Sequence, residues 1–466
     1  MNFISWSFVL LFLPLFAARF ALGQRKTERL FFWLMIAVST VFVMWHVPIY
    51  ILVMLTSITV DYAAASRIAA SNDPGQRKLF LYLSMATNLL ILGAFKYTDF
   101  ALHTTEQIFH LAGLHTTLPH LGLILPMGIS FYTFGSMSYT VDVYRNRIKP
   151  VRRFQDFYFF VTFFPHLVAG PIVRAEQFLY QFARTRRLHF RVFSHAVFLI
   201  LRGAFLKMVC ADTIASIVAP YWYHRSNTSG DQLLLTVLFS GQIFCDFEGY
   251  SSIARGLAYL MGYRFPLNFD NPYLAASFSN FWERWHITLS SWLRDYLYLP
   301  LGGNRISASR TYINLLTVML LGGLWHGASL TFVVWGAIHG LALAVERKLK
   351  LNRLDSAYPI IRLAWYMVVQ AIVLLAWIFF RSAGMHDAVY IIGKIAALKF
   401  CPLNPDIVRA TAFLLPVVGM HLYGLSREKG IAPVLGGRAK AVLAALMTVA
   451  ILALYGESSE FIYFQF

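Results

Sequence analysis

The run Leu315-Leu-Thr-Val-Met-Leu-Leu-Gly-Gly-Leu-Trp-His-Gly-Ala-Ser-Leu-Thr-Phe-Val-Val-Trp335 decides how this chain folds. Its one ionisable side chain is His326, and no carboxylate, lysine or arginine lies within ten residues on either side. An imidazole in so apolar a segment indicates a position inside a membrane, where polar side chains are costly and are retained for a function. Histidine is also the side chain best suited to accept a proton near neutral pH. The function of the chain therefore depends on what His326 does.

The composition of the whole chain supports a membrane location. Of its 466 residues, 58% are hydrophobic, 16% are aromatic and 13% are charged. A soluble domain would carry roughly a quarter of charged residues. We therefore expect an all-α polytopic membrane protein in which residues 1–466 form a single domain.

The net charge of +18 has a topological explanation. Lysine and arginine collect in the cytoplasmic loops of membrane proteins, and here they cluster between apolar runs, at residues 25–29, 67–78, 145–153, 184–191 and 347–353. We therefore expect no nucleic-acid partner. The three cysteines, Cys210, Cys245 and Cys401, have neither metal-type nor redox-type spacing, so no metal site is expected.

Apolar runs predict the membrane spans, each of which needs about 20 residues. The predicted spans are 3–18, 30–46, 49–65, 79–96, 121–145, 192–219, 232–260, 311–326, 328–346, 362–381, 408–425 and 438–456. The first run is followed, not preceded, by basic residues, so we interpret it as a retained span with its N-terminus outside. Twelve spans place both termini, and the acidic residues 457–460, on the outer, periplasmic face. The largest predicted outer loop is 97–120, which is rich in histidine.

Two stretches do not fit simple spans. Residues 154–180 are apolar but contain Pro165, Gly170 and Pro171, and residues 266–304 mix aromatic and charged residues. Irregular backbone at membrane depth persists only where protein buries it or where it lines a watery cavity. We interpret both stretches as re-entrant or interfacial segments that shape an internal cavity, which His166 could line.

His286 is the second candidate for chemistry. It lies in Phe281-Trp-Glu-Arg-Trp-His-Ile-Thr-Leu-Ser-Ser-Trp-Leu-Arg-Asp-Tyr296, next to Arg284 and Trp285. A continuous helix here would place His286 on one face with Trp282 and Ser290. The alternative is an anchor helix at the cytoplasmic interface, where tryptophan and tyrosine are enriched.

Structural alternatives also exist for the other polar residues in apolar runs. His326 could make a hydrogen bond between helices, since Gly322, Gly323 and Gly327 permit close packing. His339 resembles it in setting and is interpreted as structural. Either Asp246 or Glu248 could pair with Arg255, or this segment could line a polar tunnel. The motifs of soluble hydrolases and nucleoside triphosphatases are absent from the sequence.

Six segments together resemble the membrane-bound O-acyltransferase family, in the right order and over nearly the whole chain. They are Phe163-Phe-Pro-His-Leu-Val-Ala-Gly-Pro-Ile172, Asp246-Phe-Glu-Gly-Tyr-Ser-Ser-Ile-Ala-Arg-Gly256, Asn268-Phe-Asp-Asn-Pro-Tyr273, Phe281-Trp-Glu-Arg-Trp-His-Ile-Thr-Leu-Ser290, Tyr298-Leu-Pro-Leu-Gly-Gly-Asn304 and Gly323-Leu-Trp-His-Gly-Ala328. The ending, Phe461-Ile-Tyr-Phe-Gln-Phe466, is similar to that of the alginate O-acetylation branch of the family.

The resemblance implies a fold and a set of site residues. The fold would be a ring of about 11–12 tilted transmembrane helices, with re-entrant or interfacial helices, around a central tunnel. His326 would be the catalytic residue and His286 the second signature position. Substrate or donor contacts are expected from Arg284, Trp285, Arg294, Trp325, His166 and Asp246.

The resemblance also implies an activity. An acyl group, acetyl by expectation, would move from a cytoplasmic thioester such as acetyl-CoA across the bacterial inner membrane. It would reach hydroxyl groups of an exported polysaccharide such as alginate or cellulose, through a periplasmic acetyltransferase partner and an export complex. No bound cofactor is expected, and membrane lipid would surround the chain. The rival hypotheses are a proton-coupled transporter and a non-catalytic scaffold of a secretion complex.

Overall fold

The computed structural model describes residues 2–22, 28–114, 116–167, 170–183, 188–351, 359–454 and 462. Every regular element in these ranges is a helix, and no strand occurs in them. The predicted all-α fold class is therefore confirmed. The basic residues predicted at 25–26, 184–187 and 353, the acidic residues 457–460 and His115 lie outside the described ranges.

Seven segments of the described chain are long and apolar enough to cross a membrane. They are Tyr50–Ala70, Pro74–Lys96, Phe190–Tyr221, Leu330–Leu349, Pro359–Arg381, Pro405–Glu428 and Gly437–Leu454. The chain is thus a polytopic helical protein, although fewer segments meet the criterion than the twelve predicted. The first two predicted spans form helices of only 17 residues. The predicted span 121–145 becomes helical only at Ile129, after Pro126 and the left-handed Gly128.

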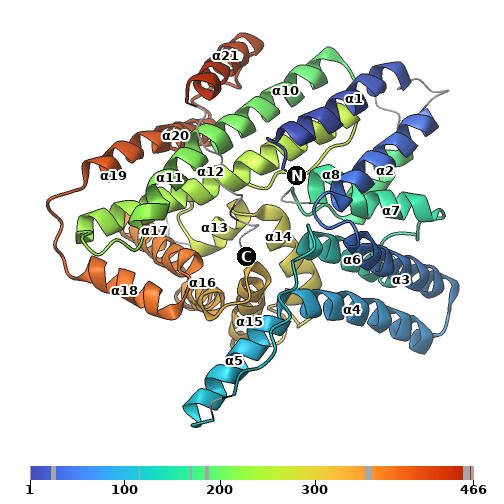
Figure 1. Cartoon of the computed structure of the whole chain (residues 1–466), viewed down its shortest axis with the longest axis horizontal. Coiled ribbons are helices and arrows are strands. Elements are labelled where there is room, and N and C mark those ends of the chain that lie inside the picture. The colour runs from blue at the N-terminus through green and yellow to red at the C-terminus, as the bar shows by residue number, and fades with distance from the viewer. Residues whose placement is uncertain are drawn as a thin grey trace. The chain divides into compact units, whose positions relative to one another are not determined.

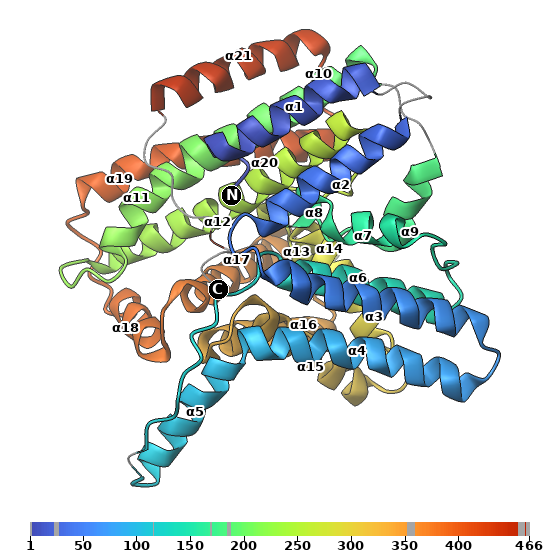
Figure 2. The ribbon, with the colours of Figure 1, turned by 45° about the vertical axis from the view of Figure 1, so that its right-hand side comes forward.

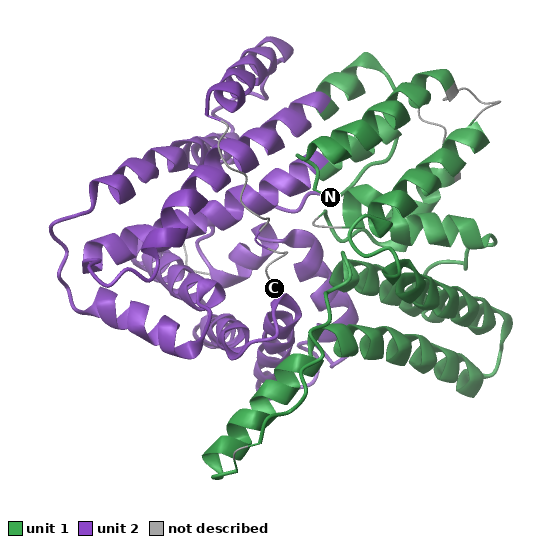
Figure 3. Cartoon of the chain, in the orientation of Figure 1, with its two compact units in different colours: residues 1–196, 254–266 green, residues 197–253, 267–466 purple. Residues whose placement is uncertain are grey.

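The chain divides into two compact units (Figure 3). Unit 1 comprises Met1–Ala196 and Ala254–Pro266, and unit 2 comprises Val197–Ile253 and Leu267–Phe466. Each unit is described by itself below. The expectation of a single domain stays a prediction.

Unit 1 consists of helices and short helical turns (Figure 1). They are α1 (Trp6–Leu22), α2 (Glu28–Met44), α3 (Tyr50–Ala70), α4 (Pro74–Lys96), α5 (Thr98–Leu111), α6 (Ile129–Tyr144), α7 (Phe154–Thr162), α8 (Phe164–Leu167), α9 (Ala175–Leu179), η1 (Tyr180–Ala183) and the first part of α10 (Phe190–Ala204), whose remainder from residue 197 belongs to unit 2. The expected irregular stretch 154–180 is confirmed as three short helices, because Pro165, Gly170 and Pro171 prevent one long helix.

A buried polar network joins α3, α4 and α6, which lie side by side in both views (Figures 1 and 2). The Asp61 carboxylate accepts a hydrogen bond from Ser84 at 2.5 Å and two from the Asn88 amide at 2.8 and 2.9 Å. It also accepts one from the Ser136 hydroxyl. Since unsatisfied polar groups are expensive away from water, this network fixes the register of the three helices.

Part of the predicted outer loop 97–120 is helical, because α5 occupies Thr98–Leu111. Two carboxylates of α5 hold residues 118–122 of the following segment against this helix. Asp99 accepts hydrogen bonds from the backbone amides of Leu121 and Gly122 at 2.8 and 3.0 Å. Glu106 accepts one from the Leu118 amide at 2.6 Å and lies 3.2 Å from the ring of His120.

Acidification is expected to release the segment that follows α5. The Leu118 amide, with His120 and His103, lowers the pKa of Glu106 below its ordinary value of 4.5. A lowered pKa means that the stabilisation is present above pH 4.5 and disappears as the pH falls through the lower, folded value. The protection factor of the Leu118 amide, which is its exchange corrected for the intrinsic rate at each pH, should therefore fall on acidification, and Glu106→Gln should show the lower protection already at neutral pH. Equal exchange in both proteins at neutral pH would contradict this assignment.

Unit 2 holds the remaining helices. They are η2 (Phe205–Ala211), α11 (Asp212–Tyr221), α12 (Ser229–Met261, whose end belongs to unit 1), η3 (Pro272–Leu274), α13 (Phe278–Arg284), α14 (Ile287–Leu293), η4 (Arg294–Tyr298), α15 (Ala308–His326), α16 (Leu330–Leu349), α17 (Pro359–Arg381), α18 (Met385–Ala396), α19 (Pro405–Ala410), η6 (Thr411–Leu414), α20 (Leu415–Glu428) and α21 (Gly437–Leu454).

Glycines allow α15 and α16 to approach closely. A Cβ atom on Gly323 would collide with the carbonyl oxygen of Phe332, and one on Gly336 would collide with that of Met319. The close packing predicted from the glycines around His326 is thus confirmed at Gly323. His326 is the last residue of α15, and the close packing of α15 with α16 places it against α16.

Candidate active site

The two histidines singled out in the sequence lie together in unit 2. The ring centroids of His286 and His326 are 6.3 Å apart, although forty positions separate the residues in the chain. His286 is fully buried and His326 is 4% exposed. Folding therefore brings two imidazole side chains from different segments into one buried place.

Aromatic side chains enclose this pair. The His326 ring lies 5.0 Å from Trp325, 5.0 Å from Trp335 and 5.4 Å from Phe380, measured between ring centroids. Trp325, predicted as a contact residue, also lies 6.1 Å from His286. Such walls keep water away from the histidines, and a dry site strengthens the electrostatic interactions of any group that reacts there.

The backbone at His286 departs from the helix predicted there. Helix α13 ends at Arg284, α14 begins at Ile287, and His286 between them is left-handed, with φ 42° and ψ 53°. The prediction of one continuous helical face through Trp282, His286 and Ser290 is therefore wrong. A non-glycine residue in this region costs roughly 1–3 kcal/mol and persists only where its surroundings impose it. The burial of His286 also contradicts the anchor-helix alternative for this residue.

The buried Asn268 holds the turn at His286 in place. Its side-chain oxygen accepts a hydrogen bond from the Thr288 hydroxyl at 2.9 Å and from the Thr288 amide at 3.3 Å. Its backbone carbonyl accepts from the Ile287 amide at 2.9 Å, and its side-chain amide donates to Ser251 at 3.2 Å. Sequence reasoning missed this role, although the motif Asn268-Phe-Asp-Asn-Pro-Tyr273 was a signal for it.

Replacing Asn268 by alanine should lower kcat and change KM much less, because His286 would lose its fixed position. A displacement of about 1 Å can reduce a rate roughly 100-fold. The matched control is Asn314→Ala, since Asn314 is similarly buried but binds the carbonyls of Leu301 and Gly303. Steady-state kinetics on both purified variants checks the effect. Equal losses of turnover in the two variants would contradict a specific role for Asn268.

Trp285 and His339 lie in aromatic packing beside the pair. The Trp285 ring centroid lies 5.0 Å from that of Phe269 and 5.0 Å from that of Trp377. His339 lies 5.1 Å from Trp282 and 4.9 Å from Trp335. Trp285 is 1% exposed, and its predicted substrate contact stays a prediction.

The two predicted arginines have different surroundings. Arg284 donates hydrogen bonds to Glu428 at 2.6 Å, to Asn280 at 3.0 Å and to the Asp270 carbonyl at 3.3 Å. These contacts tie Arg284 to α20 and to the segment after α12, and the predicted donor contact stays a prediction. Arg294 pairs with the neighbouring Asp295 at 2.7 Å, and 63% of its side chain is exposed.

A cavity of about 380 Å³ lies along α15 and contains Arg294 in its wall. Its lining comes from α13, α14, η4, α15 and α16, namely Ser279, Trp282, Glu283, Ile287, Ser290, Ser291, Leu293, Arg294, Tyr298, Leu315, Val318, Met319, Leu343 and Arg347. Charged groups and a long apolar wall therefore share one space, which suits a ligand with an anionic part and an uncharged chain.

Asp246 belongs to a buried ion cluster. Its carboxylate lies 2.8 Å from the ammonium group of Lys207, which also contacts Asp212 at 2.6 Å. The other Asp246 oxygen accepts a hydrogen bond from the backbone amide of Ile462 at 2.8 Å. The sequence argument considered only Arg255 as a cation here and overlooked Lys207, which lies 39 positions away in the chain.

Glu248 forms a separate ion pair with Arg202, and Arg202 also donates a hydrogen bond to Ser252 at 2.7 Å. These contacts join α10 to α12, where Gly203 and Gly249 meet so closely that neither position has room for a Cβ atom. The charges of the Asp246 segment therefore bind neighbouring helices and stabilise their packing.

His166 belongs to unit 1. It is 8% exposed, and its ring lies 5.8 Å from Phe178 and 5.6 Å from Phe265. Its predicted role in lining a catalytic cavity stays a prediction.

Comparisons with known proteins identify the family of this chain. The family model for MBOAT, the membrane-bound O-acyltransferase family, matches residues 33–386. The chain is 39% identical to the probable alginate O-acetylase AlgI of Pseudomonas putida, over 84% of this chain and 80% of that protein. It is 37% identical to the probable alginate O-acetylase AlgI of Azotobacter vinelandii, over 91% of this chain and 85% of that protein. It is 33% identical to the peptidoglycan O-acetyltransferase of Helicobacter pylori, over 86% and 81%. The chain therefore belongs to the membrane-bound O-acyltransferase family.

Proposed function

We propose that this acyltransferase transfers an acetyl group from a cytoplasmic thioester to hydroxyl groups of an exported polysaccharide. The observation that carries the proposal is the buried pair of His286 and His326, 6.3 Å apart in an aromatic enclosure. Relatives that are named alginate O-acetylase and peptidoglycan O-acetyltransferase support both the acetyl group and a glycan acceptor.

In the proposed reaction, His326 acts as the general base. Its imidazole takes the proton of the acceptor hydroxyl while that oxygen attacks the thioester carbonyl carbon. A new carbon–oxygen bond forms, the carbon–sulfur bond breaks, and the protonated imidazole returns its proton to the departing thiolate. Proton transfer of this kind typically contributes about 10²–10⁴ in rate. His286 would position the reacting groups or relay the proton.

The donor is proposed to be acetyl-CoA. Supporting this choice, the 380 Å³ cavity combines the cations of Arg294 and Arg347 with an apolar wall from α15. Guanidinium groups bind phosphate through charge-assisted hydrogen bonds, and the apolar wall suits the uncharged arm that carries the thioester. The same residues would serve a donor bound to a carrier through a phosphate-linked arm.

The proposed setting is the bacterial inner membrane, with the donor on the cytoplasmic side and both termini in the periplasm. A periplasmic acetyltransferase is proposed to pass the group on to alginate, cellulose or a similar polymer within an export complex. The positive-inside distribution of the basic clusters supports this orientation.

Membranes from cells that make the polysaccharide can test the proposal with radiolabelled acetyl-CoA. The expected result is label in alkali-sensitive ester linkage on the polysaccharide, dependent on this chain. The surface variant His386→Ala serves as a control that should retain labelling, since His386 is exposed on α18. Proton-coupled uptake of a solute without transfer of label would favour a transporter. Full labelling in a His286→Ala/His326→Ala double variant would favour a scaffold.

A further inference from the structure

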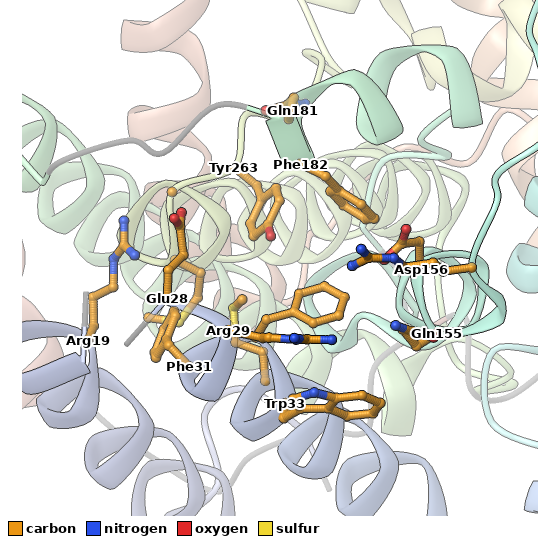
Figure 4. Close-up of a pocket in the computed structure, with 15 residues that line it drawn as sticks. Arg19, Glu28, Arg29, Phe31, Trp33, Gln155, Asp156, Gln181, Phe182 and Tyr263 are labelled. Carbon is orange, nitrogen blue, oxygen red and sulfur yellow. The ribbon is translucent and has the colours of Figure 1, made fainter. Parts of the chain in front are cut away.

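Unit 1 contains a cavity of about 620 Å³ that the proposed acetyl transfer does not use (Figure 4). Its walls come from the end of α1, the first half of α2, the start of α7, η1 and the end of α12. Its polar lining includes Arg19, Glu28, Arg29, Arg153, Gln155 and Asp156.

The charged groups of the cavity have a positive excess, since three arginines face two carboxylates. Arg19 is 9% exposed, and its guanidinium lies 5.2 Å from the centroid of the Phe31 ring. In contrast, Arg29 and Arg153 are exposed, so their guanidinium groups can meet a ligand at the mouth. Figure 4 shows Arg29, Asp156 and Tyr263 around the same space. An anion with a single charge would balance this lining.

Apolar surface adjoins these cations. Trp33, which lines the cavity, is 47% exposed, and Phe20 and Leu30, the chain neighbours of Arg19 and Arg29, are 61% and 58% exposed. Tryptophan beside arginine is typical of the boundary between lipid headgroups and acyl chains. The lining of the cavity therefore has cations for a phosphate and the exposed Trp33 ring, and α1 and α2 carry further exposed apolar side chains at Phe20 and Leu30 for a hydrocarbon tail.

We propose that this cavity binds the phosphate of an anionic glycerophospholipid, whose acyl chains lie along the exposed apolar side chains of α1 and α2. Arg29 and Arg153 would bind the phosphate oxygens, and the Gln155 amide would meet the polar headgroup. The group that these side chains would recognise is a phosphate ester, which both a phospholipid headgroup and a soluble nucleotide carry. The exposed apolar side chains at Phe20, Leu30 and Trp33 favour the lipid. This inference is independent of the acetyl donor and acceptor.

Native mass spectrometry of the whole purified protein can test the proposal. The protein in detergent is mixed with equal amounts of phosphatidylglycerol and phosphatidylcholine, and bound lipids are counted. We expect phosphatidylglycerol to be retained over phosphatidylcholine by about 25-fold, since each of two basic contacts to an anionic headgroup contributes about fivefold. Equal retention of the two lipids by the wild-type protein would overturn the proposal. Displacement of phosphatidylglycerol by ADP at equal concentration would assign the site to a soluble phosphate instead and overturn the lipid.

A pair of double variants locates the binding. Arg29→Gln/Arg153→Gln removes two cations of the cavity, and Arg67→Gln/Arg152→Gln removes two exposed cations of unit 1 that do not line it. The preference for phosphatidylglycerol should fall to nearly equal retention in the first variant and persist in the second. An equal fall in both would mean general charge attraction and would overturn the site. The lipid preference is measured on the wild-type protein and does not depend on the variants. The proposal is therefore tested even if a variant folds poorly.

Discussion

His326→Ala should reduce acetyl transfer by about 10²–10⁴, the usual contribution of a positioned general base. The ring of His326 lies within 5.0 to 5.4 Å of Trp325, Trp335 and Phe380, measured between centroids. Alanine removes both the base and this packing. The effect on activity should therefore be measured at equal amounts of protein in the membrane, by labelled acetyl on the polysaccharide.

A second substitution separates chemistry from packing. His326→Gln keeps much of the side-chain volume and its hydrogen-bonding capacity, but glutamine cannot accept a proton near neutral pH. We expect the same loss of activity with a smaller loss of thermal stability. The exposed His386→Ala should leave both quantities unchanged. If His326→Gln, present at normal levels, retained full activity, His326 would not be the base.

Lys207→Met should destabilise the protein by about 3–5 kcal/mol, because removing one partner of a buried ion pair leaves the other uncompensated. Lys207 is 1% exposed, and it is the cation that contacts both Asp212 and Asp246. A loss of this size is a large fraction of the roughly 5–15 kcal/mol that typically stabilises a folded protein. The midpoint of thermal unfolding in detergent measures it.

Two further variants control the Lys207 experiment. Lys429→Met removes one positive charge from an exposed position and should leave the midpoint unchanged. The triple variant Lys207→Met/Asp212→Asn/Asp246→Asn removes the whole set of charges and should recover part of the lost stability, since no uncompensated charge remains. A wild-type midpoint for Lys207→Met alone would show that the cluster does not stabilise the fold.

The sequence predicted several features correctly because they depend on local composition. Long apolar runs exclude a soluble fold, and the resulting helical class follows from the need to satisfy every backbone hydrogen bond within lipid. The interruptions at Pro165, Gly170 and Pro171 predicted, for a similar local reason, that residues 154–180 are not a simple span, and the structure has short helices there. The order of the motifs around His286 and His326 likewise predicted the family.

Other features were wrong or missed because they depend on contacts between distant residues. Helical periodicity predicted a continuous helix at His286, but Asn268 imposes a left-handed turn from another segment. For Asp246 the sequence suggested Arg255 as a partner or a place in a polar tunnel, and it missed Lys207, which reaches Asp246 from η2. Neither Asn268 nor Lys207 has a local signal strong enough to reveal its partner.

By itself, the sequence determined that this chain is a helical membrane protein with His326 in an apolar segment. Only the tertiary structure decided that His286 and His326 lie side by side, that Asn268 fixes the turn between α13 and α14, and that unit 1 has a basic and apolar cavity. The physical reason is that burial in lipid follows from composition along the chain. The meeting of two side chains instead depends on how helices pack, and one-dimensional periodicity does not specify that packing.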